Sequence, residues 1–194
     1  MGENRVVDLD TPGLDWAEVT MPGASSPVRL VRLHADGSTG ASVSLVRFPP
    51  GWTRPVTGHY TCAEEIAVLE GSISVSGTAH LAGAYARLPE RATRAASATG
   101  AEGCLAVAWF SGPPRWQDGV ADDAPASGGE AGAAGSVLLG SLAELPGALP
   151  ETAAVTAGFD VTFLDARAWA YVPHGTPFPD LPGRALVRRW PSGT

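Results

Sequence analysis

Lysine is absent from this sequence of 194 residues, cysteine occurs only twice, and charged residues make up 17% of the chain. The 13 basic residues are all arginine, and with 20 acidic residues the formal net charge is −7. This balance argues against a nucleic-acid partner, because nothing would neutralise phosphates in bulk. Two cysteines, Cys62 and Cys104, cannot form a disulfide framework and are typical of a reducing compartment.

Long hydrophobic runs are also missing. No apolar stretch approaches the roughly 20 residues that a membrane span needs. The first ten residues, MGENRVVDLD, lack the basic and then apolar order of a signal peptide. We therefore expect a cytoplasmic protein with no membrane partner. An apolar fraction of 44% argues against a chain that is disordered throughout.

Glycine (24 residues) and proline (17 residues) interrupt the sequence every few positions and leave little room for long helices. The runs between them have the alternation and length of strands. The expected strands are 28–33, 42–48, 66–69, 72–76, 85–88 and 104–110. Short strands at close, regular spacing predict an all-β sandwich or small barrel.

The composition changes sharply after Trp116. Residues 117–136 hold one valine and no other large apolar side chain, so they cannot bury enough surface to offset chain entropy. We expect a barrel domain over 1–116, a flexible linker over 117–136 and an extension over 137–194. The extension would add strands to the barrel or to a partner subunit, and its loose echo of the N-terminal region leaves a degenerate half-repeat open.

The most informative stretch runs from Gly51 to Gly71 and reads GWTRPVTGHYTCAEEIAVLEG. It resembles the first signature of the cupin superfamily: Gly, five residues, His-x-His, three or four residues, Glu, six residues, Gly. With four residues before the glutamate, every interval fits. Thr57 then stands in the first histidine position, His59 in the second, and Glu64 is the glutamate.

A second cupin signature, Gly, five residues, Pro-x-Gly, two residues, His, is matched in part by Gly83 and Pro89. Arg91 stands in its second glycine position and Arg94 in its histidine position. The phrases LVRFPPG and EEIAVLEG resemble the ChrR-like group, which is related to the cupin domain of a zinc-binding anti-sigma factor and to dioxygenase-like single cupins. The resemblance covers about residues 15–116 and implies a jelly-roll β-barrel.

Cupins hold Fe, Mn, Ni or Zn with three histidines and one glutamate on facing strands. Here only His59 and Glu64 match, and two protein ligands rarely hold a divalent ion tightly against water. We therefore expect no tightly bound metal cofactor. The alternative is Fe or Zn held by His59, Glu64 and Cys62, because thiolate is a good zinc ligand.

Arg94 leads to a different hypothesis for this position. A guanidinium is permanently charged and forks onto carboxylates. In the histidine position it would take over the electrostatic role of the metal, either by neutralising Glu64 or by binding an anionic oxygen of a ligand. The competing interpretation is an arginine that points to solvent from a loop.

Six residues are thus candidates for the site, three catalytic and three ligand-binding. They are, in that order, His59, Glu64 and Arg94, then Thr57, Trp52 and Tyr60. Structural roles compete with these assignments: a hydrogen-bonded histidine for His59, and aromatic residues that merely cap the core for Trp52 and Tyr60. Glu65 is expected on the opposite face of its strand from Glu64, exposed to solvent.

A fold does not fix a function. The preferred hypothesis is a small-molecule enzyme of the cyclase, isomerase or dehydratase type, without a tightly bound metal, in bacterial secondary metabolism. This resembles the metal-free cupins of polyketide and sugar metabolism. His59 or Glu64 would move a proton next to a carbonyl while Arg94 and Thr57 stabilise the oxyanion. The alternatives are a metal-dependent dioxygenase with Fe or Zn, and a non-catalytic ligand-binding or sensor cupin. A homodimer is also expected, since cupin barrels often pair through edge strands.

Overall fold

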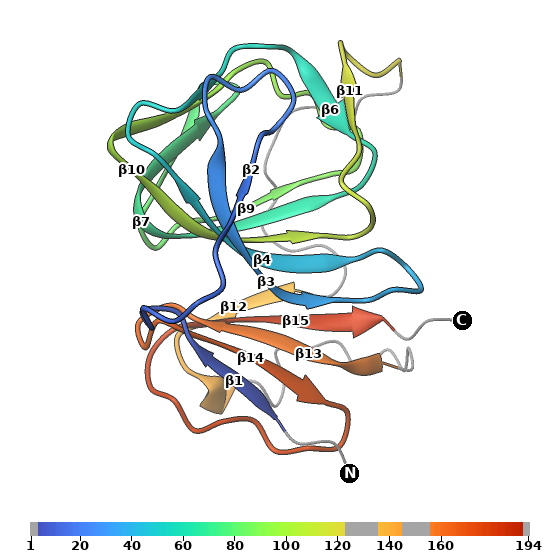
Figure 1. Cartoon of the computed structure of the whole chain (residues 1–194). Coiled ribbons are helices and arrows are strands. Elements are labelled where there is room, and N and C mark those ends of the chain that lie inside the picture. The colour runs from blue at the N-terminus through green and yellow to red at the C-terminus, as the bar shows by residue number, and fades with distance from the viewer. Residues whose placement is uncertain (1–3, 123–135, 145–155, 192–194) are drawn as a thin grey trace. The chain divides into compact units, whose positions relative to one another are not determined.

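The computed structural model describes residues 4–122, 136–144 and 156–191, and this part of the chain is almost entirely β. Its one helical element is a single 3₁₀ turn, η1 (Leu142–Glu144). The all-β expectation is therefore confirmed for the described residues. No helix in these ranges is long and apolar enough to cross a membrane. The chain divides into two compact units, a larger one (Asp15–Ala131) and a smaller one (Met1–Leu14 with Gly132–Thr194) (Figure 1).

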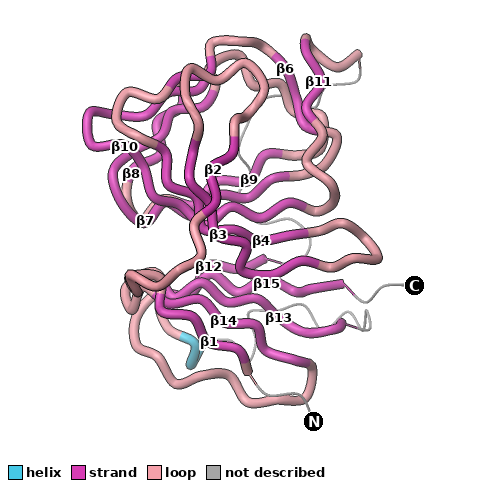
Figure 2. Tube along the Cα trace, viewed as in Figure 1, coloured by secondary structure: helices cyan, strands magenta, loops and turns pink. Residues whose placement is uncertain are grey.

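The larger unit is built on one antiparallel sheet whose strand order differs from the chain order (Figure 2). Its strands, in spatial order, are β2 (Ala17–Val19), β3 (Val28–Ala35), β4 (Ser42–Phe48), β10 (Ser97–Phe110), β7 (Glu64–Val75) and β8 (Thr78–Leu81). Two short strands lie off this path: β5 (Thr53–Arg54) pairs with β10, and β9 (Tyr85–Leu88) pairs with β7. A separate pair is formed by β6 (Gly58–Tyr60) and β11 (Trp116–Asp118).

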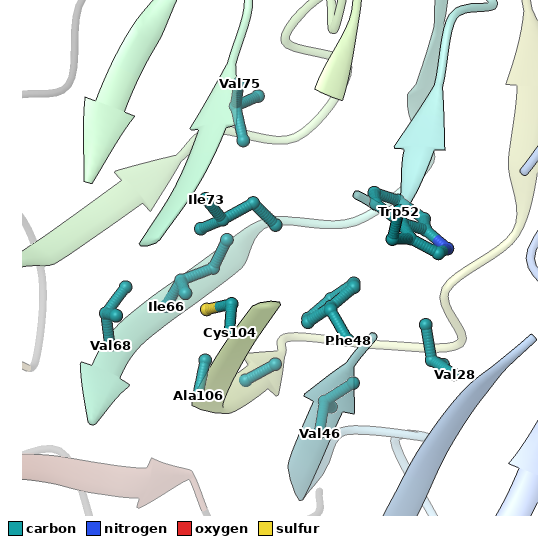
Figure 3. Packing of buried hydrophobic residues seen from close by; sticks show 11 residues of the cluster. Val28, Val46, Phe48, Trp52, Ile66, Val68, Ile73, Val75, Cys104 and Ala106 are labelled. Carbon is teal, nitrogen blue, oxygen red and sulfur yellow. The ribbon is translucent and has the colours of Figure 1, made fainter. Parts of the chain in front are cut away.

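Alternation along β7 decides which of its side chains reach the core. Ile66 and Val68 point to the inner face together with residues of β4 and β10, as the close-up of the packed cluster shows (Figure 3). The cluster comprises Val28, Val46, Phe48, Trp52, Ile66, Val68, Ile73, Val75, Cys104, Ala106 and Ala108. Because Glu64 lies two residues before Ile66, its carboxylate lies on this same inner face, at the beginning of the strand.

Most expected strands are found, with one informative difference. The expected strands 66–69 and 72–76 form the single strand β7, because Glu70 and Gly71 between them continue to pair with β10. The register between β7 and β10 shifts at this point, which marks a bulge. A glycine between two apolar runs is a turn signal, and here the partner strand overrides it.

Gly71 explains why the first motif ends in glycine. Its φ is +65°, and an added Cβ would collide with the backbone carbonyl oxygen of Gly103. Gly51 and Gly83, the opening glycines of the two motifs, also have positive φ. The motif glycines are therefore set by backbone conformation, and Gly71 also by the close approach of β10.

The substitution Gly71→Ala is expected to lower the free energy of unfolding by about 1 to 3 kcal/mol more than Gly77→Ala does. Gly77 is the matched control, because it also has positive φ, +82°, but has nothing within 4 Å of an added Cβ. Both variants share the cost of a left-handed alanine, so their difference isolates the collision with Gly103. Urea unfolding measures both; equal losses would contradict the explanation.

The smaller unit is a five-stranded antiparallel sheet that joins the two ends of the chain. Its order is β1 (Arg5–Asp8), β14 (Ala168–Pro173), β13 (Thr156–Phe163), β15 (Ala185–Pro191) and β12 (Ser136–Leu139). Apolar residues of the central strands, among them Val161, Phe163 and Val187, form its core.

The described strands of the expected extension, 137–194, thus pair with one another and with β1. The expected barrel boundary of 1–116 includes β1, which no motif or composition change separates from the residues that follow it. Most of the expected linker, 117–136, lies outside the described residues. The division into barrel, linker and extension stays a prediction.

Candidate functional site

Arg94 lies inside the larger unit. Its side chain is 1% exposed and that of Glu64 is 12% exposed. Arg94 donates to Glu64 Oε2 from Nη2 at 2.8 Å and from Nε at 3.2 Å, and its Nη1 donates to the carbonyl oxygen of Ala92 at 3.1 Å. The interpretation of Arg94 as a solvent-exposed loop residue is therefore wrong. Two of the three predicted catalytic residues thus form an ion pair in which Arg94 is buried and Glu64 is largely covered.

The backbone places this pair. Gly58 on β6 exchanges two hydrogen bonds with Arg94: the Gly58 amide donates to the Arg94 carbonyl at 3.1 Å, and the Arg94 amide donates to the Gly58 carbonyl at 2.8 Å. The segment around Arg94 therefore runs as a partner of β6, which fixes the guanidinium across from Glu64 at the beginning of β7.

Tyr60 lies at the centre of a second cluster, which comprises its own ring, two further aromatic rings and the side chain of Arg94. Its buried ring meets Phe110 and Trp116 edge-on, with ring centroids 5.3 and 5.2 Å apart. The Arg94 guanidinium carbon lies 4.8 Å from the centroid of the same ring. Burial raises the pKa of Tyr60 above its ordinary value of 10, and the negative charge of Glu64 adds to the effect. The phenol is therefore neutral at physiological pH.

A second buried arginine, Arg54, completes the cluster. Its Nη1 donates to the Tyr60 hydroxyl oxygen at 3.0 Å, and its guanidinium carbon lies 4.0 Å from the centroid of the Trp116 ring. The residue is 4% exposed. Arg54 is not among the residues that the sequence motifs mark. A signal was available, because Arg54 lies two residues after the buried Trp52 and strand alternation sends both side chains the same way.

His59 lies on the other face of β6 from Tyr60, since successive strand residues alternate. It is buried, with Nδ1 3.0 Å from the carbonyl oxygen of Gly119 and Nε2 3.0 Å from Gln117 Oε1. Both ring nitrogens are thus engaged with residues at and after β11. The structure does not bring His59 together with Glu64 and Arg94.

Thr57 and Trp52 also lie apart from the ion pair. Thr57 is exposed, and its hydroxyl donates to the carbonyl oxygen of Ala95 at 3.4 Å. Trp52 is buried in the apolar core, 4.9 Å from the ring of Phe48, and its indole N–H donates to the Ser26 carbonyl at 3.0 Å. Of the three predicted ligand-binding residues, only Tyr60 joins Glu64 and Arg94.

Comparison with known proteins identifies the family of the chain. A profile described as the ChrR Cupin-like domain matches residues 4–111. The chain belongs to this family. The predicted cupin-type jelly roll is confirmed, although the described sheets do not close into one continuous hydrogen-bonded barrel.

Solved cupin structures resemble the chain in fold. A candidate dioxygenase from Nostoc punctiforme is 16% identical with a TM-score of 0.66, over 97% of this chain and 83% of that one. The polyketide cyclase RemF from Streptomyces resistomycificus is 20% identical with a TM-score of 0.44, over 57% and 84%. At these identities the similarity shows the fold alone. A search of curated proteins finds no significant relative.

The cupin motif can be read in a second register, and the structure favours it. If three residues separate His-x-His from Glu64, the two histidine positions are Gly58 and Tyr60, with six residues instead of five after Gly51. Gly58 and Tyr60 share the face of β6 that meets Arg94. A Cβ at Gly58 would collide with the Trp116 ring. In this register the four ligand positions hold glycine, tyrosine, glutamate and arginine.

These donors do not fit a divalent cation. Among residues 4–122, 136–144 and 156–191, no three His, Cys, Asp or Glu side chains form a group that could hold an ion. Glu64 already accepts two bonds from a fixed positive charge, and the neutral phenol of Tyr60 is a poor ligand. Cys62, the alternative ligand, is buried, and burial raises the pKa of its thiol, which keeps it protonated.

Proposed function

We propose that this cupin is a small-molecule enzyme of the isomerase, cyclase or dehydratase type that works without a tightly bound metal ion. The observation that supports the proposal is the ion pair between the buried Arg94 and the largely covered Glu64, at two of the family's metal-ligand positions. A guanidinium supplies a permanent positive charge there, and the carboxylate beside it supplies a base.

Glu64 has one oxygen free for chemistry. Both bonds from Arg94 go to Oε2, and no described residue donates to Oε1. In the proposed reaction Oε1 takes a proton from the carbon next to a substrate carbonyl, and the electron pair of the C–H bond moves to the carbonyl oxygen as an enolate. The charge of Arg94 and the neutral hydroxyl of Tyr60 stabilise that oxyanion.

The same proton completes either outcome. Its return from Glu64 to a different atom of the substrate is an isomerisation, and its transfer to a departing hydroxyl group releases water and is a dehydration. The mechanism does not use His59, because both of its ring nitrogens are already hydrogen-bonded on the other face of β6. The expectation that His59 moves the proton is therefore not carried into this mechanism. The homodimer and the place in secondary metabolism stay predictions.

One experiment tests both halves of the proposal. Protein purified without chelator is analysed for Fe, Mn, Ni and Zn and is then incubated in D₂O with a panel of small ketones and oxo acids. We expect substoichiometric metal together with deuterium exchange next to a carbonyl, followed by NMR. Glu64→Gln removes the base and is expected to slow that exchange by about 10²- to 10⁴-fold.

Glu70→Gln is the matched control, since Glu70 lies on the same strand but pairs with Arg47 at the surface. Exchange that persists in Glu64→Gln would contradict the role of Glu64 as the base. Stoichiometric Fe or Zn in the active wild-type protein would overturn metal independence and favour the dioxygenase alternative.

A further inference from the structure

The cluster around Tyr60 holds one more positive charge than negative. Arg94 is neutralised by Glu64, whereas Arg54 has no carboxylate within 4.0 Å among the described residues. A buried guanidinium without a counter-ion is costly, because water no longer solvates it. Such a charge is retained at a cost to stability when an anion occupies the site during function.

The hydrogen bonds of Arg54 show which edge of its guanidinium lacks a partner among the described residues. Nη1 is held by the Tyr60 hydroxyl, and the flat face lies against Trp116. Nε is buried without a hydrogen-bond partner, and no described residue accepts a hydrogen bond from Nη2. Nε and Nη2 together form the fork with which arginine binds a carboxylate through two parallel bonds.

We propose that the Nε–Nη2 edge of Arg54 binds the carboxylate of a small organic acid. A monoanion matches the single surplus charge of the cluster, and a planar carboxylate matches the fork. Tyr60 and Trp116 are positioning residues: one holds Nη1 and the other stacks on the guanidinium.

The assignment of this acid as the substrate rests on the proposed function. The guanidinium carbons of Arg54 and Arg94 lie 5.4 and 4.8 Å from the centroid of the same Tyr60 ring. A substrate anchored by its carboxylate on Arg54 is therefore held beside the pair that would act on its carbonyl. The substrate class is a small oxo acid.

The test compares carboxylates with their neutral amides. Wild-type protein is titrated with acetate, benzoate, acetamide and benzamide while the arginine Nε–H signals are followed by ¹⁵N NMR. We expect the carboxylates alone to shift the Arg54 signal, which is assigned by its disappearance in Arg54→Lys. Arg54→Gln is expected to weaken carboxylate binding about 10- to 100-fold, as loss of a charge-assisted pair does.

Variants of Arg54 and its neighbours separate the contribution of the two-pronged guanidinium geometry from that of the positive charge alone. Arg54→Lys keeps the charge but loses the fork, and it is expected to bind more weakly than wild type. Tyr60→Phe, which frees Nη1, is expected to weaken binding and to broaden the Arg54 signal. Arg47→Gln, at the surface, is the control and leaves binding unchanged. The wild-type titration decides the matter even if Arg54→Gln fails to fold.

Two results would overturn the inference: amides that bind as tightly as carboxylates, or carboxylate binding that Arg54→Gln leaves intact. Its failure is distinguishable from that of the proposed function. Carboxylate binding at Arg54 without any deuterium exchange leaves the anion site standing and removes the enzyme. If ketones with and without a carboxylate exchange deuterium equally fast, the enzyme proposal stands and the anion site at Arg54 is removed.

Discussion

Replacing Arg94 by leucine is expected to lower the free energy of unfolding by about 3 to 5 kcal/mol. The change leaves the Glu64 carboxylate, 12% exposed, without the cation that now donates two hydrogen bonds to it. A charge that lies away from water without a partner has nothing to compensate its lost solvation. Removal of one partner therefore destabilises the protein more than removal of both. Urea unfolding of wild type and variant measures the loss.

A double-mutant cycle isolates the pair. Glu64→Leu combined with Arg94→Leu is expected to recover most of the stability, because two leucines need no counter-charge. The matched control is the Arg47–Glu70 pair, whose side chains are both 46% exposed, and Arg47→Leu is expected to cost less than about 1 kcal/mol. Additive losses in the buried cycle would contradict the ion pair as the organising contact of the site.

The fold could be predicted from the sequence because turn residues and alternation both depend on local chemistry. The segment 42–48 is a strand with the expected bounds, and so is 85–88. The glycines of the motifs stand where the backbone needs positive φ, which made their spacing informative. No local pattern predicted the pairing of β1 with β14, because these two strands lie near opposite ends of the chain.

The site was predicted only in part, for a reason that lies in strand periodicity. The cupin motif tolerates three or four residues before Glu64, and a shift of one residue turns every side chain to the other face. The four-residue interval selects Thr57 and His59 because it also keeps five residues between Gly51 and the first histidine position. The structure instead places Tyr60 beside Glu64, on the face opposite to His59.

Glu65 shows the same limit on prediction. Alternation puts it opposite Glu64 as expected, but the expectation of exposure is wrong, since the residue is 3% exposed and accepts a hydrogen bond from the Tyr85 hydroxyl at 2.8 Å. Tyr85 comes from β9, which pairs with β7 at this point. Periodicity gives the face of a strand, whereas burial depends on which other element crosses that face.

Asp160→Ala is expected to lower the free energy of unfolding of the smaller unit by about 3 to 5 kcal/mol. Asp160 on β13 lies directly opposite Arg188 on β15, and the Nη1 of Arg188 donates to both carboxylate oxygens, at 3.0 and 2.9 Å. The two side chains are 1% and 4% exposed, so the alanine variant leaves a guanidinium buried without its counter-ion. Differential scanning calorimetry and urea unfolding would measure the loss.

A surface pair in the same unit separates this effect from a general loss of charge. Asp165 pairs with Arg184 at 2.6 Å, but the two side chains are 44% and 48% exposed, and Asp165→Ala is expected to cost less stability than Asp160→Ala does, because water screens an exposed pair. The sequence pattern of β15 does not explain why an arginine stands at position 188. The structure does: Arg188 links two central strands of the sheet through its ion pair with Asp160. Equal losses in the two aspartate variants would remove that explanation, because burial would then add nothing to the worth of the pair.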